Sequence, residues 1–466
     1  MSDVNAQIQL KYVEKIRTYL SDYERKTGKR LTACVVTYGC QMNVKDSEKL
    51  AGILEDAGFN IIEDEDADLV IYNTCTVREN ANKKLYGHLG LMKHKKEENK
   101  DKMIALCGCM MQEKGVIEIL EKDYKFVDII FGTHNIYKFA ELLWERLSSG
   151  KHVLEILDKS DEIVEDLPSK RNDFFRCGVN IMYGCNNFCT FCIVPYVRGR
   201  EKSRNPKDIV RECEALAKDG VVEVMLLGQN VNSYGKTLED KMTFAELLSE
   251  IEKVEGIERI RFMTSHPKDL SDDLIKVMAS SKKICKQLHL PLQSGSSALL
   301  KKMNRHYDKD RYLLLVDKLK KAIPDICLTT DIIVGFPGET EEDFLETLDV
   351  VKKCEYDSAY TFIYSKRTGT PAATFEDQVP KDVVKDRFDR LLKLVNEISS
   401  KKTKELEGKT VKVLVDEVNK DMEGFMSGRL DNNMVVHFKG DKDLLGKFVN
   451  VKLNEAKGFY YIGELA

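Results

Sequence analysis

Two stretches of this chain alternate short apolar runs with helical periodicity, and this alternation limits the possible fold more than any other feature. In residues 31–149 there are four apolar runs, at 33–38, 68–73, 103–106 and 127–131, and a helical segment such as 46–57 or 136–147 follows each of them. Alternating strands and helices form a parallel sheet with helices on its faces. We therefore predict an N-terminal parallel-sheet α/β domain over 31–149, preceded by a helical extension over 1–30.

The second alternation is longer. Six apolar runs occur between residues 171 and 402, at 178–183, 222–227, 259–263, 287–292, 328–335 and 359–364. Helical segments separate them, and Thr340 to Asp343 form a capping-box pattern at the start of one helix. Six βα units in series predict a partial (β/α)6 TIM-like barrel, which places its chemistry at the carboxyl ends of the strands.

The pattern changes again at the C-terminal end. From residue 409 short alternating runs are separated by turn residues, which predicts a small antiparallel β-barrel of OB type over 403–466. Between the first two domains, residues 150–170 combine weak periodicity with an acidic stretch and Pro168. This composition is typical of a linker.

Composition narrows the class of protein. The 466 residues suggest about two to four domains. With 73 Lys and Arg against 77 Asp and Glu, a net charge of −4 does not mark a nucleic-acid binder. No apolar run approaches the roughly 18 residues of a membrane span, and the polar first thirty residues lack the apolar centre of a signal peptide. We expect a cytoplasmic protein whose thirteen cysteines are reduced thiols.

The densest cysteine motif directly follows the first predicted barrel strand and contains Cys185, Cys189 and Cys192. One alternative is three idle thiols. Another is zinc, but a structural zinc site takes four ligands, and this loop has no fourth Cys or His. Three thiolates on a four-iron cluster leave one iron without a protein ligand, which is useful where a cofactor fills it. The spacing resembles that of the radical S-adenosylmethionine (SAM) superfamily.

A second trio is spread over the N-terminal domain. Cys40, Cys75 and Cys109 each follow a predicted parallel strand by one to three residues. Because the carboxyl ends of parallel strands share one edge of the sheet, the three thiols should converge there. They form either a second cluster site with an open iron or three unrelated thiols. The other seven cysteines lie in apolar runs or on helices and are interpreted as structural; they are Cys34, Cys107, Cys177, Cys213, Cys285, Cys327 and Cys354.

Longer motifs around both trios resemble one family. Residues 37–43, 73–75 and 108–112 are similar to the N-terminal domain of the methylthiotransferases. Residues 184–192 and 195–201 are similar to the radical SAM core of that family, and the tail resembles a TRAM domain, an RNA-binding barrel. Residues 228–234 and 264–267 resemble the members that act on prenylated adenosine in tRNA.

The resemblance implies a function. Cys185, Cys189 and Cys192 would hold the radical SAM [4Fe-4S] cluster, and Cys40, Cys75 and Cys109 an auxiliary [4Fe-4S] cluster that supplies sulfur. One SAM would donate a methyl group and another would form the radical that removes hydrogen from C2 of the adenine. The product would be 2-methylthio-N6-dimethylallyladenosine at position 37 of tRNA, beside the anticodon. Alternatives are methylthiolation of threonylcarbamoyladenosine or of a ribosomal-protein aspartate, and a non-enzymatic iron–sulfur RNA-binding protein.

Other polar residues are weaker candidates. Four residues at or after barrel strand ends are candidates for SAM contact, with strand-end capping as the alternative: Gln229, Ser265, Gln293 and Arg305. His266 and His289 are interpreted as structural. A basic group after the cysteine loop suggests phosphate contacts or a solvated loop; it comprises Arg198, Arg200, Lys202 and Arg204.

The expected partners follow from the resemblance as well. The tail from 404 has ten basic and eleven acidic residues, so RNA binding there depends on the resemblance to TRAM domains and not on charge. We expect the anticodon region of tRNA as substrate, an electron donor such as flavodoxin or ferredoxin, no membrane, and a monomer.

Overall fold

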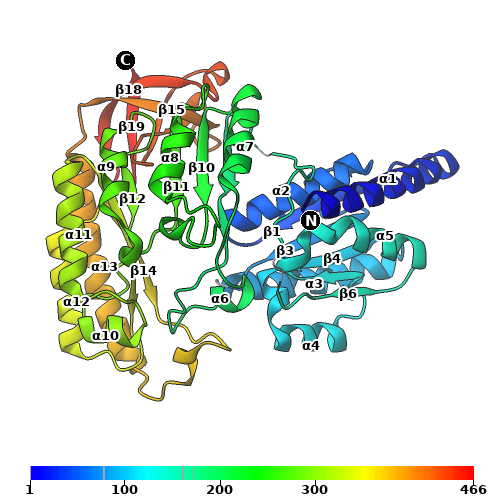
Figure 1. The fold of residues 1–466 in the computed structure, drawn as a ribbon, viewed down its shortest axis with the longest axis horizontal. Helices are drawn as coiled ribbons and strands as arrows, with labels where there is room; N and C mark the ends of the chain where they lie inside the picture. The colour runs from blue at the N-terminus through cyan, green and yellow to red at the C-terminus, as the bar shows by residue number, and fades with distance from the viewer. Residues whose placement is uncertain (1, 77–78, 160–161, 172) are drawn as a thin grey trace. The chain divides into compact units, whose positions relative to one another are not determined.

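The computed structural model describes residues 2–76, 79–159, 162–171 and 173–466, which form two compact units. The first unit contains Met1–Asp173, Tyr183–Asn186 and Ile193–Arg204. The second contains Phe174–Met182, Asn187–Cys192 and Asn205–Ala466. Figure 1 follows both units along the chain, from blue at the N-terminus to red at the C-terminus.

The first unit is built on one parallel sheet of six strands in the order β2-β1-β3-β4-β5-β6. The parallel α/β prediction is therefore confirmed. The predicted runs form β1, β3, β4 and β5, and two short strands extend the edges. The bounds are β1 Thr32–Thr37, β2 Asn60–Ile61, β3 Leu69–Thr74, β4 Met103–Gly108, β5 Ile129–Phe131 and β6 Val153–Glu155.

Helices cover both faces of this sheet. Successive residues of a strand point to opposite faces: Ile71 packs in a buried cluster with α1, α2 and α5, whereas Tyr72 packs in a second cluster with α3 and α4. The predicted N-terminal helix is α1, whose Val13, Ile16 and Leu20 are buried in the first of these clusters. The bounds are α1 Ser2–Thr27, α2 Gln41–Asp56, α3 Glu79–Glu98, α4 Lys114–Asp123, α5 Phe139–Ser149 and α6 Val194–Val197, with 3₁₀ turns η1 Cys109–Gln112 and η2 Thr133–Lys138.

Strand β6 lies inside the range 150–170 that the sequence suggested as a linker. Val153 is buried in the core beside α5, and β6 pairs with β5 from Ile129↔Val153 to Phe131↔Glu155. Three residues are too few to show a periodic pattern in the sequence. The strand forms because the edge of the sheet offers unpaired backbone groups. Residues 160–161 of the predicted linker lie outside the described residues.

The second unit contains the six predicted βα strands in chain order, all parallel. They form two three-stranded ladders, β7-β10-β11 and β12-β13-β14, linked by a single bridge between Ile260 and Ile284. The partial (β/α)6 arrangement is thereby confirmed. The bounds are β7 Arg176–Asn180, β10 Glu223–Leu227, β11 Arg259–Met263, β12 Gln287–His289, β13 Cys327–Val334 and β14 Ser358–Ile363. Two short strands, β8 Met182–Tyr183 and β9 Lys202–Ser203, form a separate pair, of which β9 belongs to the first unit.

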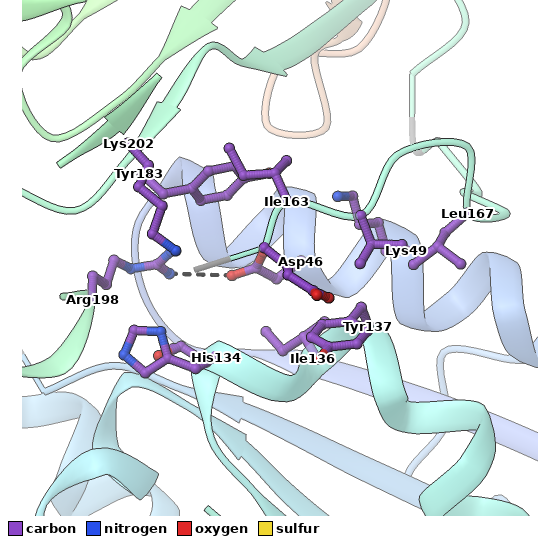
Figure 2. Close-up of a pocket in the computed structure, with 13 residues that line it drawn as sticks. Asp46, Lys49, His134, Ile136, Tyr137, Ile163, Leu167, Tyr183, Arg198 and Lys202 are labelled. Carbon is purple, nitrogen blue, oxygen red and sulfur yellow. Dashed lines mark hydrogen bonds and ion pairs between the residues drawn. The ribbon is translucent and has the colours of Figure 1, made fainter. Parts of the chain in front are cut away.

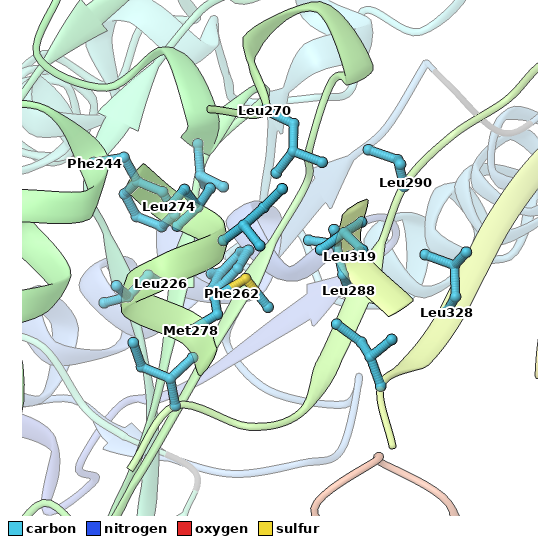
Figure 3. Close-up of a cluster of buried hydrophobic side chains, with 14 of the residues drawn as sticks. Leu226, Phe244, Phe262, Leu270, Leu274, Met278, Leu288, Leu290, Leu319 and Leu328 are labelled. Carbon is cyan, nitrogen blue, oxygen red and sulfur yellow. The ribbon is translucent and has the colours of Figure 1, made fainter. Parts of the chain in front are cut away.

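Helices pack on one side of these strands. Leu226, Phe262, Leu288 and Leu328 project into one large buried cluster with helix residues such as Leu319, as Figure 3 shows. Thr340 caps α12 as the sequence predicts, since its side chain accepts the N–H of Asp343. The bounds are α7 Pro206–Lys218, α8 Phe244–Glu252, α9 Asp272–Ser280, α10 Ser297–Lys302, α11 Lys309–Ala322, α12 Glu341–Cys354 and α13 Lys381–Lys404.

The C-terminal strands close into a five-stranded barrel in the order β15-β16-β17-β19-β18. A small closed Greek-key barrel is typical of the OB type, as predicted. One pair differs from the antiparallel expectation, because β17 and β19 run parallel. The bounds are β15 Thr410–Val418, β16 Phe425–Arg429, β17 Val435–Lys439, β18 Phe448–Ala456 and β19 Tyr460–Leu465.

Two buried arginines attach this small barrel to the amino end of the βα strands. Arg261 donates to the carbonyl oxygens of Leu430 (2.7 Å) and Asp431 (2.7 Å). Arg259 donates to the carbonyl of Arg429 at 3.1 Å. Both guanidinium groups also contact the Glu223 carboxylate, at 3.5 Å from Arg259 and 3.1 Å from Arg261.

Among the described helices, none is long and apolar enough to cross a membrane.

Candidate functional site

The three cysteines of the N-terminal domain lie at the carboxyl ends of neighbouring strands. Cys40 follows β1 and precedes α2, Cys75 follows β3, and Cys109 follows β4 as the first residue of η1. Because β1, β3 and β4 are adjacent and parallel, the three residues gather at one edge of the sheet. Cys75 and Cys109 are buried, and Cys40 is exposed.

Glycines let the chain approach the cysteines closely. Gly39 has φ +150°, and a Cβ placed on it would lie 2.9 Å from Cβ of Cys75. Gly108 has φ +98°, and a Cβ there would lie 2.3 Å from the carbonyl oxygen of Thr74. Both positions therefore require glycine, since any side chain would separate the strand ends that carry the thiols.

Two buried asparagines fix these strand ends to each other. The amide of Asn43 donates to the carbonyl oxygen of Thr74 (2.9 Å) and to Oδ1 of Asn73 (3.1 Å). Asn73 in turn donates to the carbonyl oxygen of Asn43 at 2.9 Å. Oδ1 of Asn43 also accepts from the Cys40 thiol at 3.4 Å. The loops that carry Cys40 and Cys75 are thus held in one hydrogen-bonded arrangement.

Burial disfavours thiolates in this trio unless a positive charge is bound beside them. Burial raises the pKa of the Cys109 thiol to about 12; Arg198 lowers it, and neighbouring Cys75 and Cys40 raise it further. Iron binds the thiolate, and a bound metal supplies the positive charge that stabilises it. No three His, Cys, Asp or Glu side chains among the described residues are arranged for a single metal ion. A cubane differs, because it takes each thiolate on a separate iron.

Arg198 is buried directly against this trio. Its Nε donates to Sγ of Cys109 at 3.2 Å, and its Nη2 donates to Oδ1 of Asn43 (2.9 Å) and to Oδ2 of Asp46 (3.2 Å). Burial alone would lower the pKa of Arg198, but Cys109, Asp46 and Cys40 raise it above its ordinary value. The guanidinium is therefore a permanent positive charge beside a candidate cluster ligand.

This placement corrects one sequence interpretation. The sequence suggests phosphate contacts or a solvated loop for Arg198 and Arg204, but only 9% and 5% of their surfaces are exposed, so neither alternative fits them. Arg204 instead binds both oxygens of Glu165, at 2.7 and 2.6 Å. The partners of both arginines lie far away in the sequence, so the local basic pattern did not indicate their burial. Arg200 is exposed and Lys202 is half-buried.

Arg198 and Asp46 line a small cavity of the first unit, of about 90 Å³. Figure 2 shows their ion pair, with His134 and Lys202 beside it. Burial, Lys202 and Arg198 lower the pKa of His134 to about 4, while Asp158 opposes this change. His134 is therefore a neutral ring at pH 7.

The second cysteine motif follows β8. The N–H of Cys185 donates to the carbonyl oxygen of Gly199 at 3.1 Å, and the N–H of Cys192 donates to that of Cys189 at 2.9 Å. The amide of Asn304 donates to the carbonyl oxygens of Asn187 (3.1 Å) and Phe188 (3.0 Å). These bonds shape the loop around its thiols.

Arg305 relates to Cys189 as Arg198 does to Cys109. Its Nη1 donates to Sγ of Cys189 at 3.3 Å, its Nη2 to the carbonyl of Pro291 at 3.1 Å and its Nε to Oη of Tyr307 at 3.1 Å. Each trio thus has one buried arginine that donates to a cysteine sulfur. Sequence reasoning had considered Arg305 only for contact with SAM.

The other candidate SAM residues occupy carboxyl strand ends. Gln229 follows β10, Ser265 follows β11 and Gln293 follows β12. Gln293 has φ +67°, and its buried Oε1 has no hydrogen-bond partner among the described residues. Its carbonyl and amide groups are therefore positioned to receive a ligand, since a buried amide oxygen without a partner is costly.

His266 is a residue that sequence reasoning undervalued. Its Nδ1 accepts the N–H of Lys268 at 3.2 Å, and its buried Nε2 has no partner among the described residues. Burial, with Arg305 as the next cause, strongly lowers the pKa of His266. The neutral ring therefore carries its proton on Nε2 and can donate it to a bound molecule. The sequence feature that could have identified His266 is its position just after the end of a strand.

Three family models match the chain. The radical SAM superfamily covers residues 179–351, the uncharacterized protein family UPF0004 covers 32–132, and the TRAM domain covers 404–466. Together they span both cysteine trios and the C-terminal barrel.

Named relatives match over nearly the whole length. A tRNA-2-methylthio-N(6)-dimethylallyladenosine synthase from Lachnoclostridium phytofermentans is 63% identical over 94% of this chain and 96% of its own length. The chain belongs to the tRNA-2-methylthio-N(6)-dimethylallyladenosine synthase family. Other members come from Thermoanaerobacter sp. (54% identical, covering 98% of this chain and 97% of the relative) and Clostridioides difficile (53%, covering 98% and 96%).

Solved structures support the fold. The radical SAM methyltransferase TsrM from Kitasatospora setae superposes with a TM-score of 0.53 over 74% of this chain and 77% of that chain, at 14% identity. The cobalamin-dependent radical SAM enzyme OxsB gives a TM-score of 0.52 over 84% and 62%, at 13% identity. At such identities the likeness shows the fold that this family shares with other radical SAM proteins.

Proposed function

We propose that this chain methylthiolates C2 of N6-dimethylallyladenosine in tRNA, at the adenosine beside the anticodon. The observation that carries the proposal is its 63% identity, over nearly the whole chain, to a synthase of that name. The enzyme uses SAM and [4Fe-4S] clusters, as radical SAM methylthiotransferases do.

Six cysteines would hold the two clusters. Cys185, Cys189 and Cys192 would bind the cluster that works with SAM, and Cys40, Cys75 and Cys109 the auxiliary cluster. The burial of Cys75, Cys109, Cys185 and Cys189 supports this assignment, as does the arginine that donates to one sulfur in each trio. When bound, the clusters and SAM supply the radical, the sulfur and the methyl group.

The chain itself would bind and orient the reactants. Gln293 and His266 offer an unpartnered acceptor and donor in the described part of the second unit, and Arg305 holds Cys189. With Gln229 and Ser265 at neighbouring strand ends, these groups are our candidates for SAM contact. His289 is a structural residue in this proposal, because both ring nitrogens already have neighbours, Thr329 at 3.0 Å and Asp331 at 3.4 Å.

The domains would divide the work. We assign the auxiliary cluster to residues 31–149 together with β6, the linker to the rest of 150–170, the radical chemistry to 171–402 and RNA binding to 403–466. In the last domain Phe438 and Tyr461 are buried, whereas Phe459 is 68% exposed. Phe459 is therefore the candidate for stacking on an RNA base.

Three further proposals concern the electron donor, the cellular location and the oligomeric state. A reduced flavodoxin or ferredoxin would supply electrons, the protein would act in the cytoplasm, and it would act as a monomer.

Mass spectrometry of tRNA nucleosides tests the activity. Anaerobically reconstituted protein, SAM, a reductant and prenylated tRNA should yield 2-methylthio-N6-dimethylallyladenosine and 5′-deoxyadenosine. Formation of neither compound would refute the proposal. If threonylcarbamoyladenosine in tRNA were methylthiolated instead, the substrate assignment would be wrong. A ribosomal-protein aspartate as the modified residue would contradict it equally.

A further inference from the structure

One buried amide, that of Asn43, is connected to all three candidate ligands of the auxiliary cluster. Asn43 lies in the first turn of α2, three residues after Cys40, and its side chain is fully buried. Buried polar atoms are almost always hydrogen-bonded. The partners of this amide therefore indicate what the residue does.

The oxygen of the amide faces two donors. Oδ1 of Asn43 accepts from the Cys40 thiol at 3.4 Å and from Nη2 of Arg198 at 2.9 Å. Nε of the same guanidinium donates to Sγ of Cys109 at 3.2 Å. A single acceptor thus holds one candidate ligand directly and orients the side chain that holds another.

The nitrogen of the amide faces acceptors. Nδ2 of Asn43 donates to the carbonyl oxygen of Thr74 at 2.9 Å and to Oδ1 of Asn73 at 3.1 Å. Thr74 directly precedes Cys75, so this bond fixes the backbone from which the third thiol projects. Because a guanidinium only donates and a carbonyl oxygen only accepts, the amide has one orientation in this site.

The surrounding backbone fits this side chain closely. A Cβ on Gly39 would lie 2.9 Å from Cγ of Asn43 and 2.9 Å from Cβ of Cys75. Both side chains therefore occupy the space that a glycine at position 39 leaves open. Asp at position 43 would accept but not donate, Ala would do neither, and Gln would place its amide one carbon further out. Only Asn meets both requirements at this distance.

We propose that Asn43 is the positioning residue of the auxiliary cluster site and holds Cys40, Cys75 and Cys109 in place before iron binds. On binding, the Cys40 thiol releases its proton and gives up its bond to Oδ1, whereas the bonds to Arg198 and to the Thr74 carbonyl are kept. Ligands that are already in place lose less conformational freedom when they bind. The inference rests on the proposed function only in taking these three cysteines as cluster ligands.

Release of iron into excess EDTA tests the inference on the anaerobic, reconstituted, full-length protein. Replacing a group that orients metal ligands typically weakens metal binding about 10–100-fold. Asn43→Ala should therefore release about half of its iron, one cubane of two, about tenfold faster than the wild type. The other half should leave at the wild-type rate. Asn43→Asp should behave like Asn43→Ala, because a carboxylate cannot donate to the Thr74 carbonyl, and it decides the question if Asn43→Ala does not fold.

A spectroscopic readout separates positioning from general stabilisation. In the reduced protein, the EPR signal of the auxiliary cluster should change in both Asn43 variants, and the signal of the radical cluster should not. The radical-cluster signal is the one that disappears when Cys185, Cys189 and Cys192 are all replaced by Ala. A residue that only stabilised the fold would leave the signal of a bound cluster unchanged.

The matched control is Ser47→Ala, one turn further along α2. Ser47 is 7% exposed, and its Oγ accepts from Thr37 at 2.7 Å and from Asn73 at 3.0 Å. It belongs to the same network but has no hydrogen bond to a cysteine or to Arg198 among the described residues. Ser47→Ala should lower Tm and leave both the iron release and the EPR signals as in the wild type.

Two results would overturn the inference. One is wild-type iron release and an unchanged auxiliary signal in a folded Asn43→Ala or Asn43→Asp protein. The other is equally fast release from Ser47→Ala, which would make the network a general support of the domain. Failure of the proposed function is a separate result, since the wild type would then form no methylthio product from prenylated tRNA, whatever its rates of iron release.

Discussion

Replacing Arg198 should expose how strongly the first unit depends on one buried charge. Its guanidinium contacts Asp46, Asn43 and Cys109 within 3.2 Å. Arg198→Met keeps much of the volume but leaves the Asp46 carboxylate, which is 6% exposed, without its cation. Removing one partner of a buried pair costs about 3–5 kcal/mol.

This loss should appear as a lower melting temperature. For a unit of this size, each kcal/mol of lost stability lowers Tm by about 2–4 °C. A loss of about 3 kcal/mol, the lower end of the range above, should therefore lower the Tm of the first unit by about 6–12 °C. Differential scanning calorimetry under anaerobic conditions measures it. Asp46→Asn in the Arg198→Met background should recover part of the loss, because the unpaired carboxylate is then gone.

The same variant has a second readout. An N–H donor and a positive charge beside a cluster ligand raise the reduction potential of the cluster. Arg198→Met should therefore make the auxiliary potential more negative, while Arg198→Lys should lie between Met and wild type. A Tm within 2 °C of the wild type, or no gain from Asp46→Asn, would refute the reasoning about the buried pair.

Three further predictions address other parts of the chain. Reconstituted protein should hold about eight irons, and the triple Ala variant of Cys185, Cys189 and Cys192 about four; an iron assay that shows no loss contradicts the assignment of that loop. Cys75→Ala should lose methylthio product yet still form 5′-deoxyadenosine, because it leaves the radical-cluster loop intact; a folded variant with that cluster that forms none argues against two separate roles. Because the pKa of His134 is lowered in the folded state, the unfolded chain binds a proton on this ring between about pH 6.5 and pH 4, whereas the folded chain does not. Stability should therefore fall by about 2 kcal/mol, after discounting for partial exposure, as pH falls through this window, and His134→Gln should flatten the urea-midpoint profile; parallel profiles would exclude His134 as the cause.

The positions of the cysteines could be predicted because they depend on local pattern. Cys40, Cys75 and Cys109 each follow an apolar run, and parallel strands bring such positions to one edge. The structure has the same strands and the same order of cysteine and strand end. Short-range sequence pattern was therefore sufficient to predict the candidate site and most of the fold.

Burial of charge could not be predicted in this way. Arg198 lies in a basic segment that resembles a solvated loop, and its partner Asp46 is 152 residues away. A cation's burial depends on a partner that only tertiary structure supplies. The three-residue strand β6 and the parallel pair β17–β19 were missed for the same reason, since their pairing is decided by distant neighbours.

The two cysteine trios differ in how much of the chain must be folded before a metal can bind. Cys185, Cys189 and Cys192 lie within eight successive residues, so a short stretch of chain presents all three thiols. Cys40, Cys75 and Cys109 meet only when β1, β3 and β4 are paired. Iron delivery to the auxiliary site must therefore wait for a completed sheet, and occupancy of that site reports correct folding of the domain during maturation of the protein.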